Sequence, residues 1–308
     1  MYATGSRSSI TLAVNDINND NRMDVLVVSN DTGAIDILYG VFGGFANSID
    51  FYTSSVPYYF ALGDFNHDSR LDIIVANSAA NNIAVLLAND DGSFPKELIY
   101  FVGDSPQIVA VGDVNHDSYL DIVIANAETN DVSVLLGYGN GTFAEQMRYN
   151  NGGASQSLAL ADVNNDKHLD IILANVGWGH GCVLFGSGNG SFVNLTTYAT
   201  GFDPHSIATG DLNNDDRLDI IVANSGDNDI SVLLGYGNGS FAEQMIYPTG
   251  SSPEFVVVGD FDEDANLDVV VVNKDSRDIS VLFGDGNGSF PSQIKYSTGS
   301  SPRSAAHC

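Results

Sequence analysis

The sequence predicts an all-β fold made of six similar four-stranded units, arranged as the blades of a propeller. Three observations support this prediction. An acidic nine-residue segment recurs six times, and its copies are separated by 48 residues once and then by 49 residues four times. Each interval contains four apolar, strand-like runs, with no stretch of helical periodicity. A spacing of about 40 to 50 residues per four-stranded unit is typical of a propeller blade.

The four runs of a unit differ in their pattern, and the fifth unit illustrates them. The first run, SIATG, leads into the acidic segment. The second, LDIIVAN, is apolar at nearly every position, so we expect it to be buried between neighbouring sheets. The third, ISVLLGYG, ends in an Asn-Gly turn, which strongly indicates a hairpin. The fourth, FAEQMIYPTG, alternates between apolar and polar residues, so we expect it at an exposed rim.

The recurring acidic segments and strand-like runs define one propeller domain over residues 1–308. The repeats cover approximately residues 6–55, 56–103, 104–152, 153–201, 202–250 and 251–299. Residues 300–308 match the start of a further repeat, so we expect the chain to be a fragment of a longer protein. The alternative to a six-bladed ring is therefore a segment of a seven-bladed one. The first ten residues, MYATGSRSSI, do not have the pattern of a signal peptide.

The composition narrows the classes of partner. Asp and Glu number 39 against 11 Lys and Arg, which gives a formal net charge of −28. Such a surface repels nucleic acid and anionic membranes and attracts cations. No apolar run is long enough to span a membrane, so we expect no membrane insertion. Two cysteines are too few for a disulfide framework, and Cys182 is expected to be a small buried residue. We expect a monomer.

The recurring acidic segment predicts a metal site. In DVNHDSYLD, from Asp113 to Asp121, positions one, five and nine are carboxylates and position three is an amide. At a separation of about 5 Å and an effective dielectric constant near 20, each carboxylate pair costs about 3 kcal/mol. Oxygen ligands at these four positions, with a backbone carbonyl at position seven, suit Ca²⁺. The alternative is a set of Asx turns, in which the side chains bond their own backbone, but these would not require oxygen at the same four offsets in six loops.

The same five positions recur in all six segments, so the sequence predicts up to six calcium ions. The predicted ligands, with position seven acting through its carbonyl, are Asp16, Asn18, Asp20, Arg22, Asp24, Asp64, Asn66, Asp68, Arg70, Asp72, Asp113, Asn115, Asp117, Tyr119, Asp121, Asp162, Asn164, Asp166, His168, Asp170, Asp211, Asn213, Asp215, Arg217, Asp219, Asp260, Asp262, Asp264, Asn266 and Asp268.

The segment is not an EF-hand, because strands flank it and its twelfth position, where a bidentate Glu belongs, is apolar in every copy. The D-x-N-x-D-x-x-x-D loop, the VLLGYGNGSF segment and the constant period resemble FG-GAP-type repeats, including the variant called VCBS repeats. The resemblance covers practically the whole chain. It implies a β-propeller with calcium in the loop between the first two strands of each blade, similar to integrin α-subunit heads and some fungal lectins.

The chain departs from this resemblance at position six of the loop, where the family has Gly. A glycine there suits a sharp turn, whereas most other residues tolerate the left-handed conformation less well. Lys167 also adds a positive charge beside its site, while Asp262 adds a carboxylate to the sixth loop. We therefore rank the fourth and sixth loops as the weakest candidates. The six residues at this position are Asn21, Ser69, Ser118, Lys167, Asp216 and Ala265.

Three functions are compatible with the sequence. The leading hypothesis is a non-enzymatic, calcium-stabilised propeller that acts in adhesion or in recognition of a protein or glycan ligand. We expect it outside the cell or at its surface, because cytosolic calcium would leave such sites mostly empty. The second is a lectin with pockets between blades, in which Trp178 stacks on a sugar and His180 donates a hydrogen bond; alternatively, Trp178 packs against the adjacent blade. The third is a polysaccharide lyase or hydrolase. No nucleophile triad occurs in the sequence, so we expect no enzymatic activity.

Overall fold

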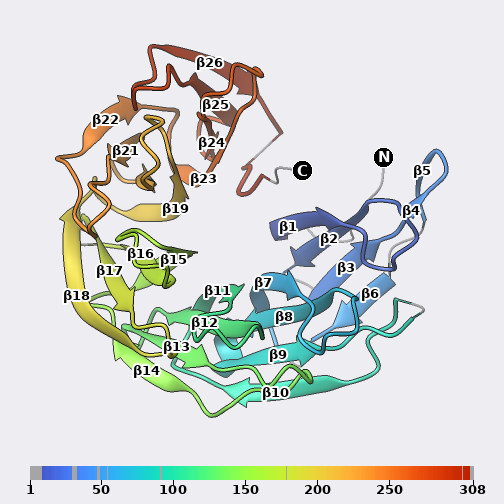
Figure 1. Cartoon of the computed structure of the whole chain (residues 1–308). Helices are drawn as coiled ribbons and strands as arrows, with labels where there is room; N and C mark the ends of the chain where they lie inside the picture. Colours follow the sequence, from blue (N-terminus) through green and yellow to red (C-terminus); the bar gives the residue numbers. More distant parts are fainter. Residues whose placement is uncertain are drawn as a thin grey trace. The chain divides into compact units, whose positions relative to one another are not determined.

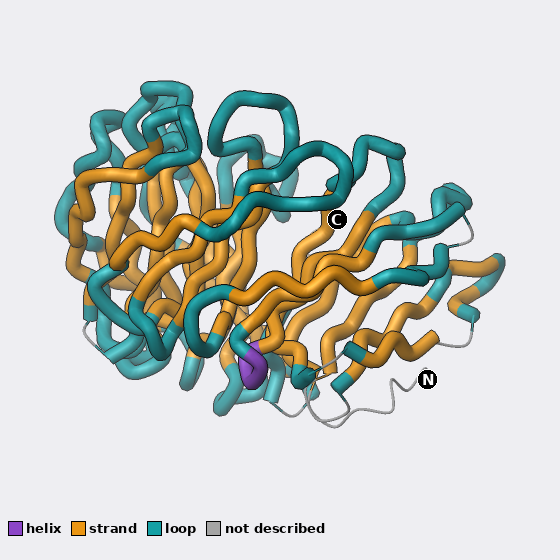
Figure 2. The backbone as a smooth tube through the Cα atoms, turned by 90° about the horizontal axis from the view of Figure 1, so that it is seen from below, coloured by secondary structure: helices purple, strands orange, loops and turns teal. Residues whose placement is uncertain are grey.

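The computed structural model describes residues 9–29, 33–46, 49–53, 55–90, 92–177, 179–299 and 301–305. The described residues form six four-stranded antiparallel sheets, a two-stranded ribbon and one short 3₁₀ turn (Figures 1 and 2). These sheets confirm the predicted all-β fold with six four-stranded propeller blades. The chain divides into two compact units at the junction of Asn150 and Asn151, and each unit contains three sheets.

In the first unit, the strands of each sheet follow one another in chain order. The first sheet contains β1 (Ser9–Asn15), β2 (Asp24–Ser29), β3 (Ala34–Leu38) and β6 (Ile49–Tyr52), and the ribbon consists of β4 (Gly40–Val41) and β5 (Gly44–Phe45). The second contains β7 (Pro57–Gly63), β8 (Asp72–Asn77), β9 (Asn82–Leu86) and β10 (Glu97–Phe101), with the 3₁₀ turn η1 at Ser78–Ala80. The third contains β11 (Pro106–Gly112), β12 (Asp121–Asn126), β13 (Asp131–Leu135) and β14 (Met147–Asn150).

The second unit has the same plan. Its first sheet, the fourth of the chain, contains β15 (Ser155–Ala161), β16 (Asp170–Asn175), β17 (His180–Gly186) and β18 (Phe192–Ala199). The fifth contains β19 (Pro204–Gly210), β20 (Asp219–Asn224), β21 (Asp229–Leu233) and β22 (Met245–Pro248). The sixth contains β23 (Pro253–Gly259), β24 (Asp268–Asn273), β25 (Asp278–Phe283) and β26 (Ser292–Ser297).

The second strand of each sheet lies in the core, as its apolar pattern predicts. Every residue of β8, β12, β16 and β20 is buried. Within each unit, these side chains pack against the neighbouring sheet; Ile73 and Val75 of β8, for example, share a cluster with Ile35 and Ile37 of β3. Each fully buried Ile or Val contributes about 1.5–3 kcal/mol relative to an exposed one. Stacking of sheet on sheet therefore stabilises each unit.

The fourth strand lies at an exposed rim, which confirms the second part of the same prediction. Half-buried and exposed residues alternate along β14 and β22, and all six residues of β26 are exposed. The last strand of each sheet thus contributes fewer side chains to the core than the second.

A buried asparagine ends the second strand in the second to sixth sheets. In the third sheet, the Nδ2 of Asn126 donates to Asp131 Oδ1 at 2.9 Å and to Ser133 Oγ at 2.8 Å. These bonds hold the end of β12 to β13, at the opposite end of β12 from the acidic segment.

In the fourth sheet, Cys182 takes the place of the serine and is fully buried, as predicted. Burial raises the pKa of its thiol to about 12, so it stays protonated.

None of the helical segments that the structure describes is long and apolar enough to span a membrane.

Candidate functional site

Each acidic segment forms a loop between the first and second strands of its sheet. We call residues 16–24, 64–72, 113–121, 162–170, 211–219 and 260–268 the acidic loops one to six. In the third sheet, Gly112 of β11 is paired with Asp121 of β12, so position nine of the loop is already the first residue of the second strand. The loops are therefore the ends of tight antiparallel hairpins.

The carboxylate at position nine is completely buried in all six loops and accepts two backbone hydrogen bonds. In loop three, Asp121 Oδ2 accepts from the Val114 N–H at 2.9 Å, and Asp121 Oδ1 accepts from the Gly137 N–H at 2.8 Å. The first donor is in the loop and the second follows the third strand. The equivalent bonds are present in the other five loops. Each oxygen keeps a further acceptor site, because a carboxylate has about four.

The other polar side chains of the loop wrap around its own backbone. In loop three, Asp113 accepts from the N–H groups of Asp117 at 3.1 Å and Ser118 at 2.8 Å. Asn115 Oδ1 accepts from the Asp117 N–H at 2.9 Å, and Asp117 Oδ1 accepts from the Tyr119 N–H at 2.8 Å. These are the Asx-type bonds that the sequence offered as an alternative to metal binding. The two interpretations are compatible, because these carboxylate oxygens also retain acceptor capacity.

The backbone of the loop takes the left-handed conformation at two positions in every copy. The φ angle at position six lies between 63° and 70°, whether the residue is Asp216, Lys167 or Ala265. Position four has φ values between 55° and 63°. All six loops lack Gly at position six and adopt the same turn. The backbone conformation of loops four and six therefore does not differ from that of the other loops. Lys167 and Ala265 carry strain there that Asn and Asp avoid.

Two observations test whether the loops fit a cation. Among the described residues, Asp260, Asp262 and Asp268 of loop six each offer a carboxylate oxygen, and these oxygens lie within 4.8 Å of one another. In loop five, Asn213 Oδ1 is buried and has no hydrogen-bond partner within the described part of the chain. Converging carboxylates repel one another, and an unpaired buried oxygen is costly. A hard, oxygen-preferring cation would relieve both, so the donor set fits Ca²⁺.

Three loops contain a guanidinium group next to the carboxylate at position five. The distance from the Arg nitrogen to the carboxylate oxygen is 3.7 Å for Arg22, 2.6 Å for Arg70 and 3.4 Å for Arg217. The sequence pattern predicts only the backbone carbonyl of position seven as a ligand, and it does not reveal this contact of the arginine side chain. These arginines partly neutralise loops one, two and five, whereas loop six has Asn266 at the same position.

Burial raises the pKa of the position-nine carboxyl to about 6 in loops two to five, at Asp72, Asp121, Asp170 and Asp219. The two backbone donors lower the pKa in each case, and repulsion by the carboxylates at positions five and one of the same loop raises it further. When no cation is bound, these four carboxyl groups therefore keep their protons to a higher pH in the folded protein than an ordinary carboxyl group does.

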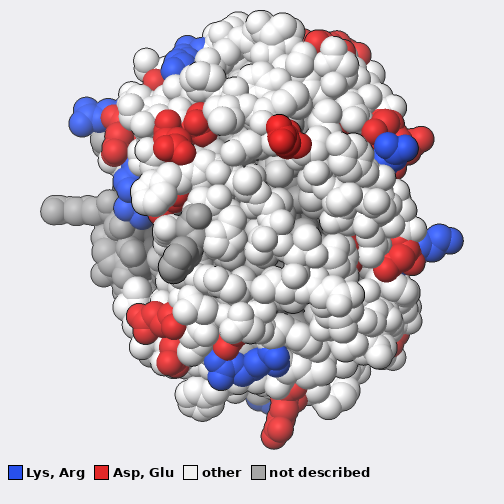
Figure 3. Space-filling model, turned by 90° about the vertical axis from the view of Figure 1, so that its left-hand side faces the viewer, with Lys and Arg blue, Asp and Glu red and all other residues white. Residues whose placement is uncertain are grey.

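Figure 3 shows one face of the protein, on which acidic side chains stand in separate groups with uncharged surface between them. On this face, the charge is therefore unevenly distributed.

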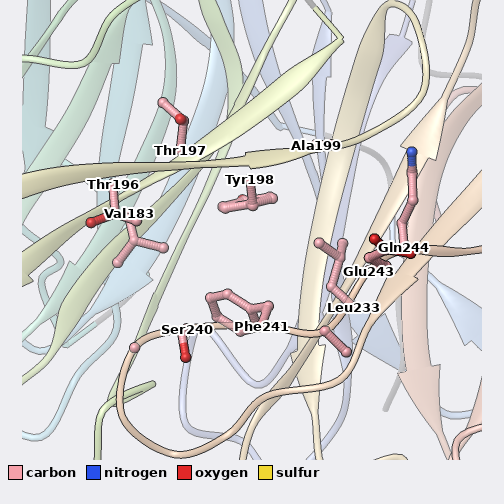
Figure 4. Close-up of a pocket in the computed structure, with 12 residues that line it drawn as sticks. Val183, Thr196, Thr197, Tyr198, Ala199, Leu233, Ser240, Phe241, Glu243 and Gln244 are labelled. Atoms are coloured by element: carbon pink, nitrogen blue, oxygen red, sulfur yellow. The ribbon is translucent and has the colours of Figure 1, made fainter.

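The second unit contains a pocket between its first two sheets. β17, β18 and residues 239–244 line it, and it encloses about 310 Å³. Figure 4 shows Tyr198 pointing from β18 toward Phe241, with Ser240 below them. The ring centroids of Tyr198 and Phe241 are 5.7 Å apart. The size and the mixture of aromatic and polar groups are typical of a small-molecule site.

The first unit contains a comparable pocket of about 460 Å³ between its first two sheets. Ile37, Tyr39, Phe51 and residues 92–95 line it, and the lining is mostly apolar. Tyr39 donates a hydrogen bond from its hydroxyl to the Gly92 carbonyl at 2.8 Å, across the two sheets.

Of the two residues proposed from the sequence as sugar contacts, the structure places one relative to this pocket. Trp178 lies outside the described residues. His180 begins β17 and is half-buried, but it is not part of the pocket lining. The pocket residues were missed because they come from two different repeats and none of them is unusual in sequence on its own.

Comparison with known proteins gives a family match and several similar structures. The family model described as an FG-GAP-like repeat matches residues 16–75, 64–124, 113–173, 162–222 and 211–271. No curated protein matches the chain by sequence.

Three solved structures share the fold. A protein from Lactobacillus plantarum has 16% identity and a TM-score of 0.74, with 98% of this chain and 88% of that chain covered. A lectin from Agrocybe aegerita that recognises non-reducing terminal N-acetylglucosamine has 18% identity and a TM-score of 0.67, covering 94% and 80%. A Bacteroides fragilis protein proposed to be a 6-phosphogluconolactonase has 13% identity and a TM-score of 0.65, covering 95% and 96%. At these identities, the likeness shows the fold alone.

The strain at position six leads to a stability prediction. Replacing Ala265 with Gly should raise the free energy of unfolding by about 1 kcal/mol, because Gly adopts a positive φ without a Cβ penalty. Asp216→Gly is the matched control in the same unit, since Asp already tolerates this conformation, and its effect should be smaller. Urea unfolding in about 0.5 M salt, which screens the lost charge, would measure both. Equal effects of the two substitutions would contradict the strain argument.

The raised pKa values lead to a pH prediction for the calcium-free protein. Between the ordinary carboxyl pKa of 3.8 and the folded value of about 6, the folded state binds more protons than the unfolded chain. Stability therefore falls as the pH rises through this range. Protein stripped of divalent ions should melt at a higher temperature at pH 5 than at pH 7.5 in a calorimetric scan. A melting temperature that increases from pH 5 to pH 7.5 would contradict this.

Proposed function

The chain belongs to the FG-GAP-like repeat family, and we propose that it is a calcium-stabilised recognition module that binds a protein or glycan ligand outside the cell. The main support for this proposal is the shared plan of the six loops. Each loop brings side-chain oxygens from positions one, three, five and nine to one tight hairpin. The residues that would hold calcium are those at these four positions, with the carbonyl of position seven.

Calcium would remove the electrostatic cost that the loops otherwise bear. The formal net charge of −28 would fall to −16 with six bound Ca²⁺. The guanidinium groups in loops one, two and five perform part of this neutralisation, and loop six depends most on a cation. Affinity near 10⁻⁴ M is typical of extracellular calcium modules, so occupancy requires the calcium concentration found outside cells. The proposed calcium sites and the proposed extracellular setting are therefore consistent with each other.

A second candidate function is carbohydrate binding, which the pocket between the fourth and fifth sheets favours. Its aromatic floor and polar rim resemble the chemistry that recognises sugars, and a lectin is among the proteins that share the fold. The proteins of similar fold also include one proposed to be an enzyme, so the fold does not choose between binding and catalysis. We propose binding, because the pocket has only one ionisable carboxylate, Glu243, and acid–base cleavage of a glycan needs two.

Removal of calcium should strongly destabilise the protein. At about 1 mM calcium and a dissociation constant near 10⁻⁴ M, each site contributes roughly 1.4 kcal/mol, and three sites in one unit contribute about 4 kcal/mol. A chelator should therefore lower the melting temperature on the order of 10 °C. Excess magnesium serves as the control cation, since it prefers smaller octahedral sites and should not restore stability. An unchanged melting curve after chelation would reject structural calcium.

Calcium stoichiometry tests the assignment of single loops. The double variant Asp113→Asn and Asp117→Asn should reduce the number of calcium ions bound per chain by one, because loop three loses two of its three carboxylates. Glu128→Gln removes an exposed acid of the same sheet outside the loop and should leave the number unchanged. Isothermal titration calorimetry would give both values. A loss of binding that is equal in the two variants would show only a general effect of charge.

A further inference from the structure

At two junctions between adjacent sheets, a tyrosine of the fourth strand contacts the hairpin of the next sheet. Between the second and third sheets, the Tyr100 hydroxyl accepts a hydrogen bond from the Phe143 N–H at 3.1 Å, and the two rings meet edge to face at 5.7 Å. Between the fifth and sixth sheets, Tyr247 and Phe290 form the same contact at 5.3 Å, and the Phe290 backbone bonds to Tyr247. The tyrosine thus bridges from one sheet to the hairpin of the next.

The equivalent tyrosine between the fourth and fifth sheets is turned away from this bridge. The Tyr198 hydroxyl donates to the carbonyl of Leu173, in β16 of its own sheet, at 3.1 Å. Tyr198 is only 9% exposed, and its ring is tilted by 56° to Phe241 where the other two pairs are close to perpendicular. No hydrogen bond then joins the ring to the neighbouring hairpin, and the groove opens into the pocket of Figure 4.

A single glycine explains the different orientation. The cross-strand partner of the tyrosine is Ile83 in the second sheet and Ile230 in the fifth, but it is Gly181 in the fourth. A Cβ atom at Gly181 would lie 2.3 Å from the Tyr198 ring and 2.4 Å from its hydroxyl oxygen. The ring therefore occupies the space that an isoleucine side chain fills in the second and fifth sheets.

The open pocket has one apolar surface and a polar edge. The rings of Tyr198 and Phe241, with Val183 and Leu233, form the apolar part. The hydroxyl groups of Thr196 and Ser240 and the side-chain amide of Gln244 supply polar atoms at the edge. Gln244 is fixed by Ser231, whose Oγ donates to Gln244 Oε1 at 2.5 Å, and its Nε2 donates one hydrogen bond to the Thr200 carbonyl at 3.4 Å, which leaves the second N–H of the amide. A fixed amide gives directional recognition at low entropic cost.

The charge of the lining limits the ligand. Among the described residues that line the pocket, there is no Lys or Arg, and Glu243 is the one charged residue. Glu243 makes no hydrogen bond or ion pair with any residue that the structure describes, so it is available to accept from a hydroxyl. An anionic ligand would be repelled, and a purely apolar one would leave the polar edge unsatisfied. A ring with one apolar face and hydroxyl groups around its edge fits both surfaces.

From this geometry we propose that the pocket between the fourth and fifth sheets binds an uncharged sugar ring, and that Gly181 creates the pocket by allowing Tyr198 to fold inward. The proposal deepens the recognition function proposed above, and it does not require calcium at any particular loop. It makes the fourth sheet functionally different from the others, although its strands have the same topology.

The variant Gly181→Val tests the proposal, because it restores the branched apolar side chain found at this position in the neighbouring repeats. Val should push the Tyr198 ring into the groove and close the pocket. Saturation-transfer NMR with N-acetylglucosamine, glucose, galactose and mannose as probes should show binding of at least one sugar to the natural protein. The affinity of Gly181→Val for that sugar should fall at least about tenfold, as expected when the sugar ring loses the aromatic surface on which it stacks.

Three controls make the result specific. Ile230→Val changes the equivalent strand position of the fifth sheet and should leave sugar binding unchanged. Glucuronate should bind more weakly than glucose, because Glu243 repels its carboxylate. The melting temperature of Gly181→Val should not fall by more than a few degrees, which separates closure of the pocket from loss of the fold.

Two outcomes would overturn the proposal. Absence of saturation transfer from the natural protein to all four sugars would remove sugar as the ligand class. Undiminished binding by folded Gly181→Val would place the sugar elsewhere. Failure of calcium binding in the titration above, with sugar binding intact, would reject the calcium assignment alone and leave this inference standing.

Discussion

The buried carboxylate at position nine of each acidic loop is the interaction on which the sheets depend. Asp121 receives one backbone N–H from the loop and another from the residue that follows the third strand. A single side chain at the start of β12 thereby fixes the end of β11 and the end of β13. Because a buried charge is tolerated only when it is hydrogen-bonded, this carboxylate and its two donors must form together. The same arrangement in all six sheets explains why the acidic residues recur with so constant a spacing.

Neighbouring sheets within a unit are joined at the same end by a second recurring contact. The Asn-Gly hairpin of one sheet donates a backbone N–H to the residue at position two of the preceding acidic loop: Gly141 donates to Phe65 O at 2.8 Å, and Gly288 to Leu212 O at 2.9 Å. The position-two N–H is itself a donor to the buried carboxylate. The hairpin turn and the acidic loop, which are separate motifs in the sequence, are therefore parts of one hydrogen-bonded layer.

The presence of six similar repeats determined how much of the fold could be predicted from the sequence. Six copies made the strands, the hairpins and the burial of the second strand predictable, since patterns that recur at one spacing must serve the same structural role. The left-handed φ at position six was expected from the resemblance, but the one at position four was not, because Glu263 does not favour it and the closed hydrogen-bond network imposes it. The pocket was missed for a different reason. The effect of Gly181 depends on Tyr198, seventeen residues later, and on a hairpin of the next repeat, and a one-dimensional pattern does not show which side chain fills an empty space.

The same layer connects the fourth acidic loop to the pocket. Asp170 accepts from the Val163 N–H at 3.1 Å, and the Val163 carbonyl accepts from the Gly239 N–H at 3.2 Å. Gly239 is the first residue of the hairpin segment that lines the pocket opposite Tyr198. A change in the charge or position of loop four would thus be transmitted to one wall of the pocket through two backbone hydrogen bonds, while the opposite wall is held by the ring packed on Gly181. One wall of the pocket is therefore positioned by apolar packing, and the other is positioned by the electrostatics of an acidic loop. A cation in that loop would stabilise the proposed binding surface as well as the fold.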